Sequence, residues 1–171
     1  GKDHTIKNLT IASSGMYTGL FGKLNEGNVM NLVLDNVNIS STDNRAGIVA
    51  GYLNAAGSTI ENIKIYNSSV SANHSNGAGG VIGNAKFDVT ISNIVIRNTT
   101  ISNQANVAGG IIGQIDAATA TVSDIDIQAI ITSAGERVGG VFGEVKKSSS
   151  AVIEPDFVVS RAVLRVDLNG T

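Results

Sequence analysis

The sequence predicts an all-β protein, a parallel β-helix (solenoid) of about five coils. A Gly-apolar-apolar-Gly tetrad recurs along the chain, with its closing glycines 29, 32, 30 and 30 residues apart. A second pattern, apolar-x-Asn-apolar-x-apolar, recurs between the tetrads. Within both patterns apolar and polar residues alternate, which is the period of a strand with one buried face. Short repeated units without a helix bury their apolar face most simply by stacking on one another.

Glycine closes every copy of the tetrad. The copies are Gly19-Leu20-Phe21-Gly22, Ile48-Val49-Ala50-Gly51, Gly80-Val81-Ile82-Gly83, Gly110-Ile111-Ile112-Gly113 and Gly140-Val141-Phe142-Gly143. We expect these glycines to permit a bulge or a close approach of two backbones. A phosphate-binding loop is disfavoured, because the Gly-Lys-Ser/Thr ending is missing and no helix is expected after any copy.

Asparagine recurs at a fixed place in the second pattern. Asn31, Asn62, Asn93 and then Asp124 follow one another at intervals of 31 residues. Asn36, Asn67 and Asn98 form a second column that ends at Ala129, and Ser40, Ser71, Ser102 and Ser133 form a third. Because stacked coils lie about 4.8 Å apart, such asparagines can pass amide hydrogen bonds along the axis.

Three short strands fit each unit, with turns at 55–58, 73–77 and 103–106. The alternation predicts that Ile63, Ile65, Ile94 and Ile96 point into the core. A β-propeller fits less well, because its blades are longer, at roughly 40 residues, and usually carry a Trp or Asp signature. A β-sandwich would not need repeated sequence.

The tetrad register ends after Gly143, which divides the chain into two regions. Residues 1–145 contain the repeats, and residues 146–171 are predicted to form a C-terminal loop and a capping strand. The strand pattern is FVVSRAVLRVDL, from Phe157 to Leu168. A solenoid end exposes a coil edge and needs a terminal element that differs from the repeats.

The second apolar residue of the tetrads forms a column of its own, consisting of Phe21, Ala50, Ile82, Ile112 and Phe142. Strict alternation would point this column outward as an apolar stripe, and such stripes usually mark a contact surface. In that outward arrangement the neighbours Lys23, Tyr52, Asn84, Gln114 and Glu144 would point the other way. A glycine-permitted bulge would instead turn the column into the core. Large residues at both ends of the column favour burial.

Composition excludes several classes of function. The net charge is -2 and basic residues never occur more than twice in a row, so nucleic acid is not an expected partner. Cysteine is absent, which excludes disulfides, thiolate zinc sites and cysteine nucleophiles within these residues. No apolar run approaches the roughly 20 residues of a membrane-spanning helix.

The tetrads GLFG, GGVIG and GGIIG, followed by NLVL, NIKI and NIVI, resemble the GLUG repeats of bacterial surface proteins. The resemblance covers residues 4–145. The family with these repeats includes the repeat region of streptococcal IgA1-type metalloproteases and repeats of adhesin-like proteins. It implies a right-handed β-helix in a secreted or cell-surface protein. The His-Glu-x-x-His motif of such proteases is missing from this chain, so no catalytic domain is expected here.

Few residues suggest chemistry. We expect no catalytic residues, no cofactor and no metal site, because His4 and His74 are isolated and the pair Asp124 and Asp126 does not recur from coil to coil. Sugar binding would use exposed aromatic residues, for which the candidates are Tyr17, Tyr52 and Tyr66, with Tyr17 and Tyr52 as possible neighbours.

Three functions remain open. The favoured one is a non-catalytic structural module, such as a stalk, spacer or assembly unit, of an extracellular bacterial protein. The second is an adhesin-type binding module for host glycoprotein or glycan, and the third is a polysaccharide-active enzyme. The expected partners are neighbouring domains of the same chain, further copies of the chain, or a host glycoprotein or glycan.

Overall fold

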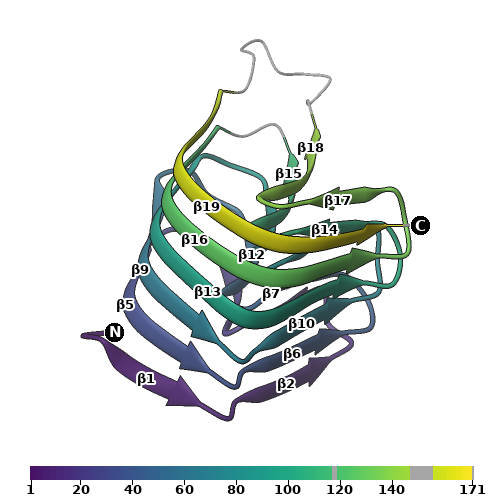
Figure 1. The fold of residues 1–171 in the computed structure, drawn as a ribbon, viewed down its shortest axis with the longest axis horizontal. Coiled ribbons are helices and arrows are strands. Elements are labelled where there is room, and N and C mark those ends of the chain that lie inside the picture. Colours follow the sequence, from purple (N-terminus) through teal and green to yellow (C-terminus); the bar gives the residue numbers. More distant parts are fainter. Residues whose placement is uncertain (117–118, 147–155, 171) are drawn as a thin grey trace.

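The predicted all-β solenoid is confirmed. A computed structural model describes residues 1–116, 119–146 and 156–170, and within them every regular element is a strand. The strands form three parallel sheets, which we call A, B and C, stacked into about five coils (Figure 1). None of the described elements is a helix of the length and hydropathy needed to cross a membrane.

Sheet A forms the long outer wall of the solenoid. Its nine strands are β1 (His4–Lys7), β2 (Thr10–Ser13), β5 (Asn28–Asp35), β6 (Asn38–Ser41), β9 (Ser58–Tyr66), β10 (Ser69–Ala72), β13 (Val89–Asn103), β16 (Ala120–Ser133) and β19 (Phe157–Gly170). In the first three coils two strands make up each rung, whereas a single long strand makes up each later rung.

Sheets B and C are narrower. Sheet B contains β3 (Tyr17–Thr18), β7 (Arg45–Gly47), β11 (Ala78–Gly79), β14 (Val107–Gly109) and β17 (Arg137–Gly139). Sheet C contains β4 (Phe21–Leu24), β8 (Ala50–Leu53), β12 (Ile82–Ala85), β15 (Ile112–Asp116) and β18 (Phe142–Lys146).

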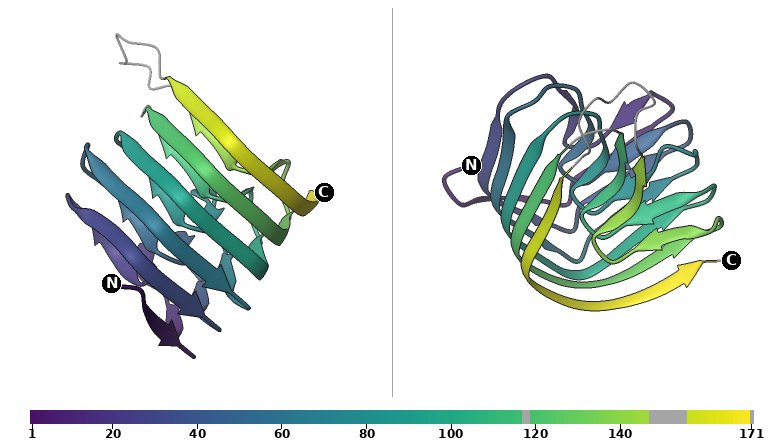
Figure 2. Two further views of the ribbon diagram at one scale, coloured as in Figure 1. Left: turned by 60° about the vertical axis from the view of Figure 1, so that its left-hand side comes forward. Right: turned by 90° about the horizontal axis from the view of Figure 1, so that it is seen from above.

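Each coil runs along sheet A, turns back through sheet B, and leaves through sheet C for the next rung of sheet A. Figure 1 shows that the later coils lie above the earlier ones. In the view from above, the chain turns counterclockwise as it advances towards the viewer, so the solenoid is right-handed (Figure 2). Right-handed crossovers between parallel strands are the rule in proteins.

The core lies between sheet A and the corner formed by sheets B and C. Ile63, Ile65, Ile94 and Ile96 are fully buried there, as predicted from the alternating pattern. Ile94 pairs with Ile63 in the rung below and with Ile125 in the rung above. Identical or similar side chains therefore lie over one another along the axis.

The chain bends within sheet A at the first asparagine column. Asn31, Asn62, Asn93 and Asp124 all have φ between 52° and 57°, in the left-handed region that asparagine and aspartate tolerate best among residues with a side chain. Asn62 Nδ2 donates to Asn31 Oδ1 at 2.7 Å, and Asn93 Nδ2 donates to Asn62 Oδ1 at 3.2 Å. Asparagine therefore serves both the backbone bend and the contact between coils.

The second asparagine column makes the other bend in sheet A. Asn36 donates to Asn8 at 2.8 Å and Asn98 donates to Asn67 at 3.3 Å, while Asn67 donates to Asp35 instead of Asn36. The column stops because the next rung is one residue shorter, so that Ile96 pairs with Ile127 but Thr99 pairs with Ala129.

Because this residue is missing, the predicted serine column is wrong at its last member, Ser133. Ser40, Ser71 and Ser102 are partners, but the partner of Ser102 in the next rung is Thr132. Ser133 pairs with Asn103 and turns inward, where it is buried. Counting residues at a constant interval therefore fails at this coil.

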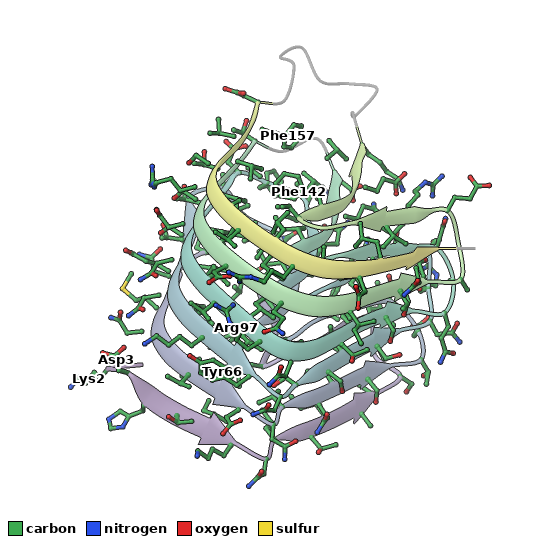
Figure 3. The ribbon with its side chains drawn as sticks, viewed as in Figure 1. Lys2, Asp3, Tyr66, Arg97, Phe142 and Phe157 are labelled. Atoms are coloured by element: carbon green, nitrogen blue, oxygen red, sulfur yellow. The ribbon has the colours of Figure 1, made fainter. Side chains whose placement is uncertain are left out.

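The residues predicted as a capping strand form β19, which runs parallel to β16 from Phe157 to Gly170 as a sixth rung of sheet A. The loop predicted before it, from residue 147 to 155, lies outside the described residues. Phe157 packs on Phe142 of sheet C, with ring centroids 6.1 Å apart (Figure 3). Through this contact β19 covers part of the open core of the fifth coil.

Candidate functional site

The tetrad glycines sit where sheets B and C meet. A Cβ added to Gly83 would lie 2.7 Å from the backbone N of Ala46, and one added to Gly113 would lie 2.7 Å from the backbone O of Ala78. Gly51 and Gly143 have equally close backbone neighbours in the coil below. Real Cβ atoms do not approach backbone atoms this closely, so glycine is required at these positions.

The second apolar column of the tetrads is buried in the middle coils. Ala50, Ile82 and Ile112 are 0% exposed, and Phe142 is half-buried against β19, whereas Phe21 in the first coil is 40% exposed. The arrangement that places both apolar residues of the tetrad in the core is therefore correct.

The residues that follow the closing glycines line the corner between sheets B and C, and we call them the corner column. They are Lys23, Tyr52, Asn84, Gln114 and Glu144, each paired with the next in sheet C. Tyr52, Asn84 and Gln114 are buried, and Glu144 is half-buried. This column places polar side chains directly next to the core, and it is our candidate site.

Two of the predicted tyrosines meet at the N-terminal end of the corner column. The Tyr17 and Tyr52 rings are stacked, with centroids 4.7 Å apart and planes 9° from parallel. Tyr17 comes from sheet B and Tyr52 from sheet C, so the corner brings them together. Tyr52 is 7% exposed, whereas Tyr17 is half-buried, so Tyr17 presents the accessible ring of the pair.

Two basic residues flank this tyrosine stack. Arg45 Cζ lies 4.7 Å from the Tyr52 centroid and 5.5 Å from the Tyr17 centroid, and Lys23 Nζ lies 6.0 Å and 5.9 Å from the same two centroids. Nearly equal distances to both rings place the cations beside the stack instead of over one outer face. Burial raises the pKa of the Tyr52 phenol above its ordinary value.

The middle of the corner column is held by one carboxylate. Asn84 Nδ2 donates to Asp116 Oδ2 at 3.0 Å, and Gln114 Nε2 donates to Asp116 Oδ1. The other amide oxygens, Asn84 Oδ1 and Gln114 Oε1, are buried and have no hydrogen-bond partner among the residues that the structure describes. Buried oxygens of this kind are normally bonded to ordered water.

Ion pairs close the C-terminal end of the corner column. Arg137 Nε lies 3.3 Å from Glu144 Oε1, and Lys146 Nζ lies 3.4 Å from Glu144 Oε2. Both basic side chains are nearly half exposed, which limits the strength of these pairs. The column thus changes from aromatic and basic at one end to a neutralised carboxylate at the other.

The third predicted tyrosine is not part of this site. Tyr66 ends β9 in sheet A, where its rung partners are Asp35 and Arg97 (Figure 3). The aromatic candidates therefore do not form one surface.

The acidic residues considered for calcium are engaged in ion pairs. Arg161 bonds both carboxylate oxygens of Asp124, and Asp126 lies between Arg97 and Arg165. These contacts lower the pKa of both aspartates, with Arg161 and Arg97 as the largest causes. Across residues 1–116, 119–146 and 156–170, no group of three or more His, Cys, Asp or Glu is placed to hold a metal ion.

Sequence reasoning missed Arg45, Asp116 and Arg161. Arg161 occupies the first asparagine column with a left-handed φ of 48°, but it follows Asp124 after 37 residues, so the repeat interval could not reveal it. Arg45 and Asp116 gave no signal, because neither residue type recurs in the adjacent coil: Arg45 pairs with Tyr17, and Asp116 pairs with Lys146.

No protein-family model matches the sequence, and neither does any curated protein. Among solved structures, the chain is similar to the crystal structure of a Bacteroides ovatus protein described as a putative immunoglobulin A1 protease. The two are 20% identical with a TM-score of 0.49, and the match covers 95% of this chain and 68% of the other. A likeness at this level carries no argument about activity.

Proposed function

We propose that the chain is a non-catalytic structural module, a stalk or spacer, of a bacterial cell-surface or secreted protein. The observation that carries the proposal is the use of polar side chains to join successive coils. Asn31, Asn62 and Asn93 bond one another along the axis, and Asp124 continues the column to Arg161 on the last rung.

The ends of the solenoid support the same function. Among the described strands, none pairs with the outer edge of β19, and the inward-facing Leu164 and Leu168 on it are 41% and 47% exposed. Phe21, in the first coil, is 40% exposed. Open parallel edges with apolar residues suit a unit that continues into neighbouring structure. The GLUG-like tetrads support the extracellular setting.

The experiment is a replacement in the full-length parent protein, displayed on its own cell. Residues 1–171 are deleted in one variant and exchanged for an unrelated β-solenoid with the same number of rungs in another. A spacer predicts that deletion impairs the parent's activity towards large or distant targets and that the exchange restores it. Failure of the exchange to restore activity would show that the side chains of this module act themselves.

The second candidate is a binding module for host glycoprotein or glycan, and the tyrosine stack favours it. Tyr17 offers an accessible aromatic ring next to Lys23 and Arg45, which suits the apolar face of a sugar with polar groups at its rim.

Glycan-array binding tests this candidate with Tyr17→Ala, and Tyr66→Ala serves as the matched control on sheet A. Loss of binding in Tyr17→Ala alone would establish the module as a lectin-like domain. An array without binding, or equal binding by both variants, would exclude the tyrosine stack as a glycan site.

A further inference from the structure

Sheet A has a notch on its outer face where the fifth coil lacks a corner residue. In β13 the pair Arg97-Asn98 makes the bend, with Asn98 exposed and in the left-handed conformation at φ 50°. Gln128 alone occupies this place in β16, and Arg165 pairs with it in β19 without a further shift. The outer corner present in four coils is therefore cut away in the last two rungs.

The missing corner leaves an open cavity of about 750 Å³, which we call the corner notch. Its lining includes Asn98, Thr100, Gln128, Ile130, Arg165 and Asp167. This volume lies within the range of roughly 300 to 1,000 Å³ that is usual for small-molecule sites. The notch lies on sheet A, away from the corner column between sheets B and C.

Several polar groups in the corner notch are unused. Asn98 donates its amide to Asn67 at 3.3 Å, but the next rung has no asparagine to bond its Oδ1. Within the described residues the side chains of Thr100, Gln128 and Asp167 form no hydrogen bond or ion pair, and all three residues are exposed. Amide, hydroxyl and carboxylate groups thus converge on one hollow with free donors and acceptors.

Apolar surface lies among these polar groups. Ile130 is 46% exposed on this face, although it belongs to the regular sheet. An aliphatic patch inside a polar rim suits a ligand that has one apolar face and many hydroxyl groups.

The charges of the corner notch and its border balance. Arg97 and Arg165 both contact Asp126, and Asp167 adds a second negative charge, which gives two positive and two negative groups. A site without net charge does not select for an anion or a cation. We propose that the corner notch binds a neutral saccharide, with its C–H face on Ile130 and its hydroxyl groups bonded to Gln128 and Asp167.

This proposal goes beyond the structural role, which would stand if the corner notch bound nothing. Saturation-transfer NMR with glucose, galactose, N-acetylglucosamine and their neutral disaccharides serves as the first test, followed by titration of the labelled protein with the saccharide that gives the largest signal. Gln128→Ala and Asp167→Ala should each weaken binding about tenfold, the effect of losing one or two good hydrogen bonds.

Two controls locate the site. Gln104→Ala removes an exposed glutamine from a turn outside the corner notch, and Tyr17→Ala removes the accessible ring of the tyrosine stack, so neither should change the affinity. Inserting one asparagine after Gln128 restores the missing corner and should abolish binding while the far-UV circular dichroism spectrum stays that of the parent.

Three results would overturn the proposal. They are the absence of any transfer signal with these saccharides at millimolar concentration, unchanged binding in both Gln128→Ala and Asp167→Ala, and loss of binding in Tyr17→Ala alone. The last result would assign sugar binding to the tyrosine stack instead.

Discussion

Arg161 and Asp124 occupy the same corner of two neighbouring rungs, and the guanidinium of Arg161 bonds both carboxylate oxygens of Asp124. Both residues have a left-handed backbone, with φ of 48° and 54°. An ion pair thus replaces the amide contact that joins Asn62 to Asn93 lower in the same column. In this column the last rung is attached by charge, whereas Asn62 is joined to Asn31 and Asn93 by neutral hydrogen bonds.

The first prediction concerns acid. Arg161 lowers the pKa of Asp124 below its ordinary value of 3.8, so this pair stabilises the fold above that value and its contribution is lost as the pH falls through the lowered pKa. Arg161→Asn keeps a residue that tolerates the left-handed conformation but removes the charge. The urea concentration at the unfolding midpoint should therefore fall less between pH 6 and pH 3 in Arg161→Asn than in the parent. An equal fall in both proteins would contradict the assignment.

The second prediction concerns the tetrad glycines. A Cβ at Gly113 would lie 2.6 Å from Gly83 O and 2.7 Å from Ala78 O, and backbone atoms of packed sheets cannot move aside. Gly113→Ala should destabilise the protein by about 3 kcal/mol or more in urea unfolding. Gly22→Ala is the matched control, because its nearest atom is Tyr17 O at 3.2 Å and β4 is the end strand of sheet C within the described residues. Similar losses in both variants would mean that the glycines serve another purpose.

The third prediction separates two roles of asparagine. Asn93 has φ of 54° and donates to Asn62. Asn93→Gly keeps the backbone conformation and loses the hydrogen bond, whereas Asn93→Ala loses both. The unfolding free energy of Asn93→Ala should therefore be lower than that of Asn93→Gly by about 1 to 2 kcal/mol, which is the cost of a left-handed residue with a Cβ. If the two variants unfold at the same urea concentration, the bend is not strained.

The fourth prediction tests the core register. Ile94 is fully buried between Ile63 and Ile125, so Ile94→Ala should leave a cavity and cost about 2 to 5 kcal/mol of unfolding free energy. Thr90→Ala on the exposed face of the same strand should change it by less than about 0.5 kcal/mol. Comparable losses would place Ile94 outside the core.

Repetition explains which parts of the fold were predictable. A residue that recurs in successive coils, such as the closing glycine or Asn62, reports the same environment several times, and its period reveals the stack. Departures from the period carry no such support. Asn98 and Ala129 are 31 residues apart, the normal interval, yet Thr99 is the structural partner of Ala129.

The candidate site was less accessible to sequence reasoning for the same reason. Tyr17 and Tyr52 are 35 residues apart and lie on different sheets, so their stacking depends on the angle between sheets B and C. Asp116 is bonded by Gln114 two residues earlier on β15 and by Asn84 in the coil below, and alternation along one strand does not predict the contact with Asn84.

The last prediction tests the burial of the second apolar column. Ile112 is 0% exposed and pairs with Ile82 and Phe142, so Ile112→Lys would place an ammonium group in the core without a partner. The desolvation cost of a buried charge is comparable to a whole domain's stability of about 5 to 15 kcal/mol, so this variant should lose its β-sheet circular dichroism at 25 °C. Val95→Lys is the matched control, because Val95 is paired with Lys64 on the outer face of sheet A and a lysine fits that column. Val95→Lys should stay folded. A folded Ile112→Lys that had lost self-association or partner binding would instead show that the tetrad column faces outward as a docking surface.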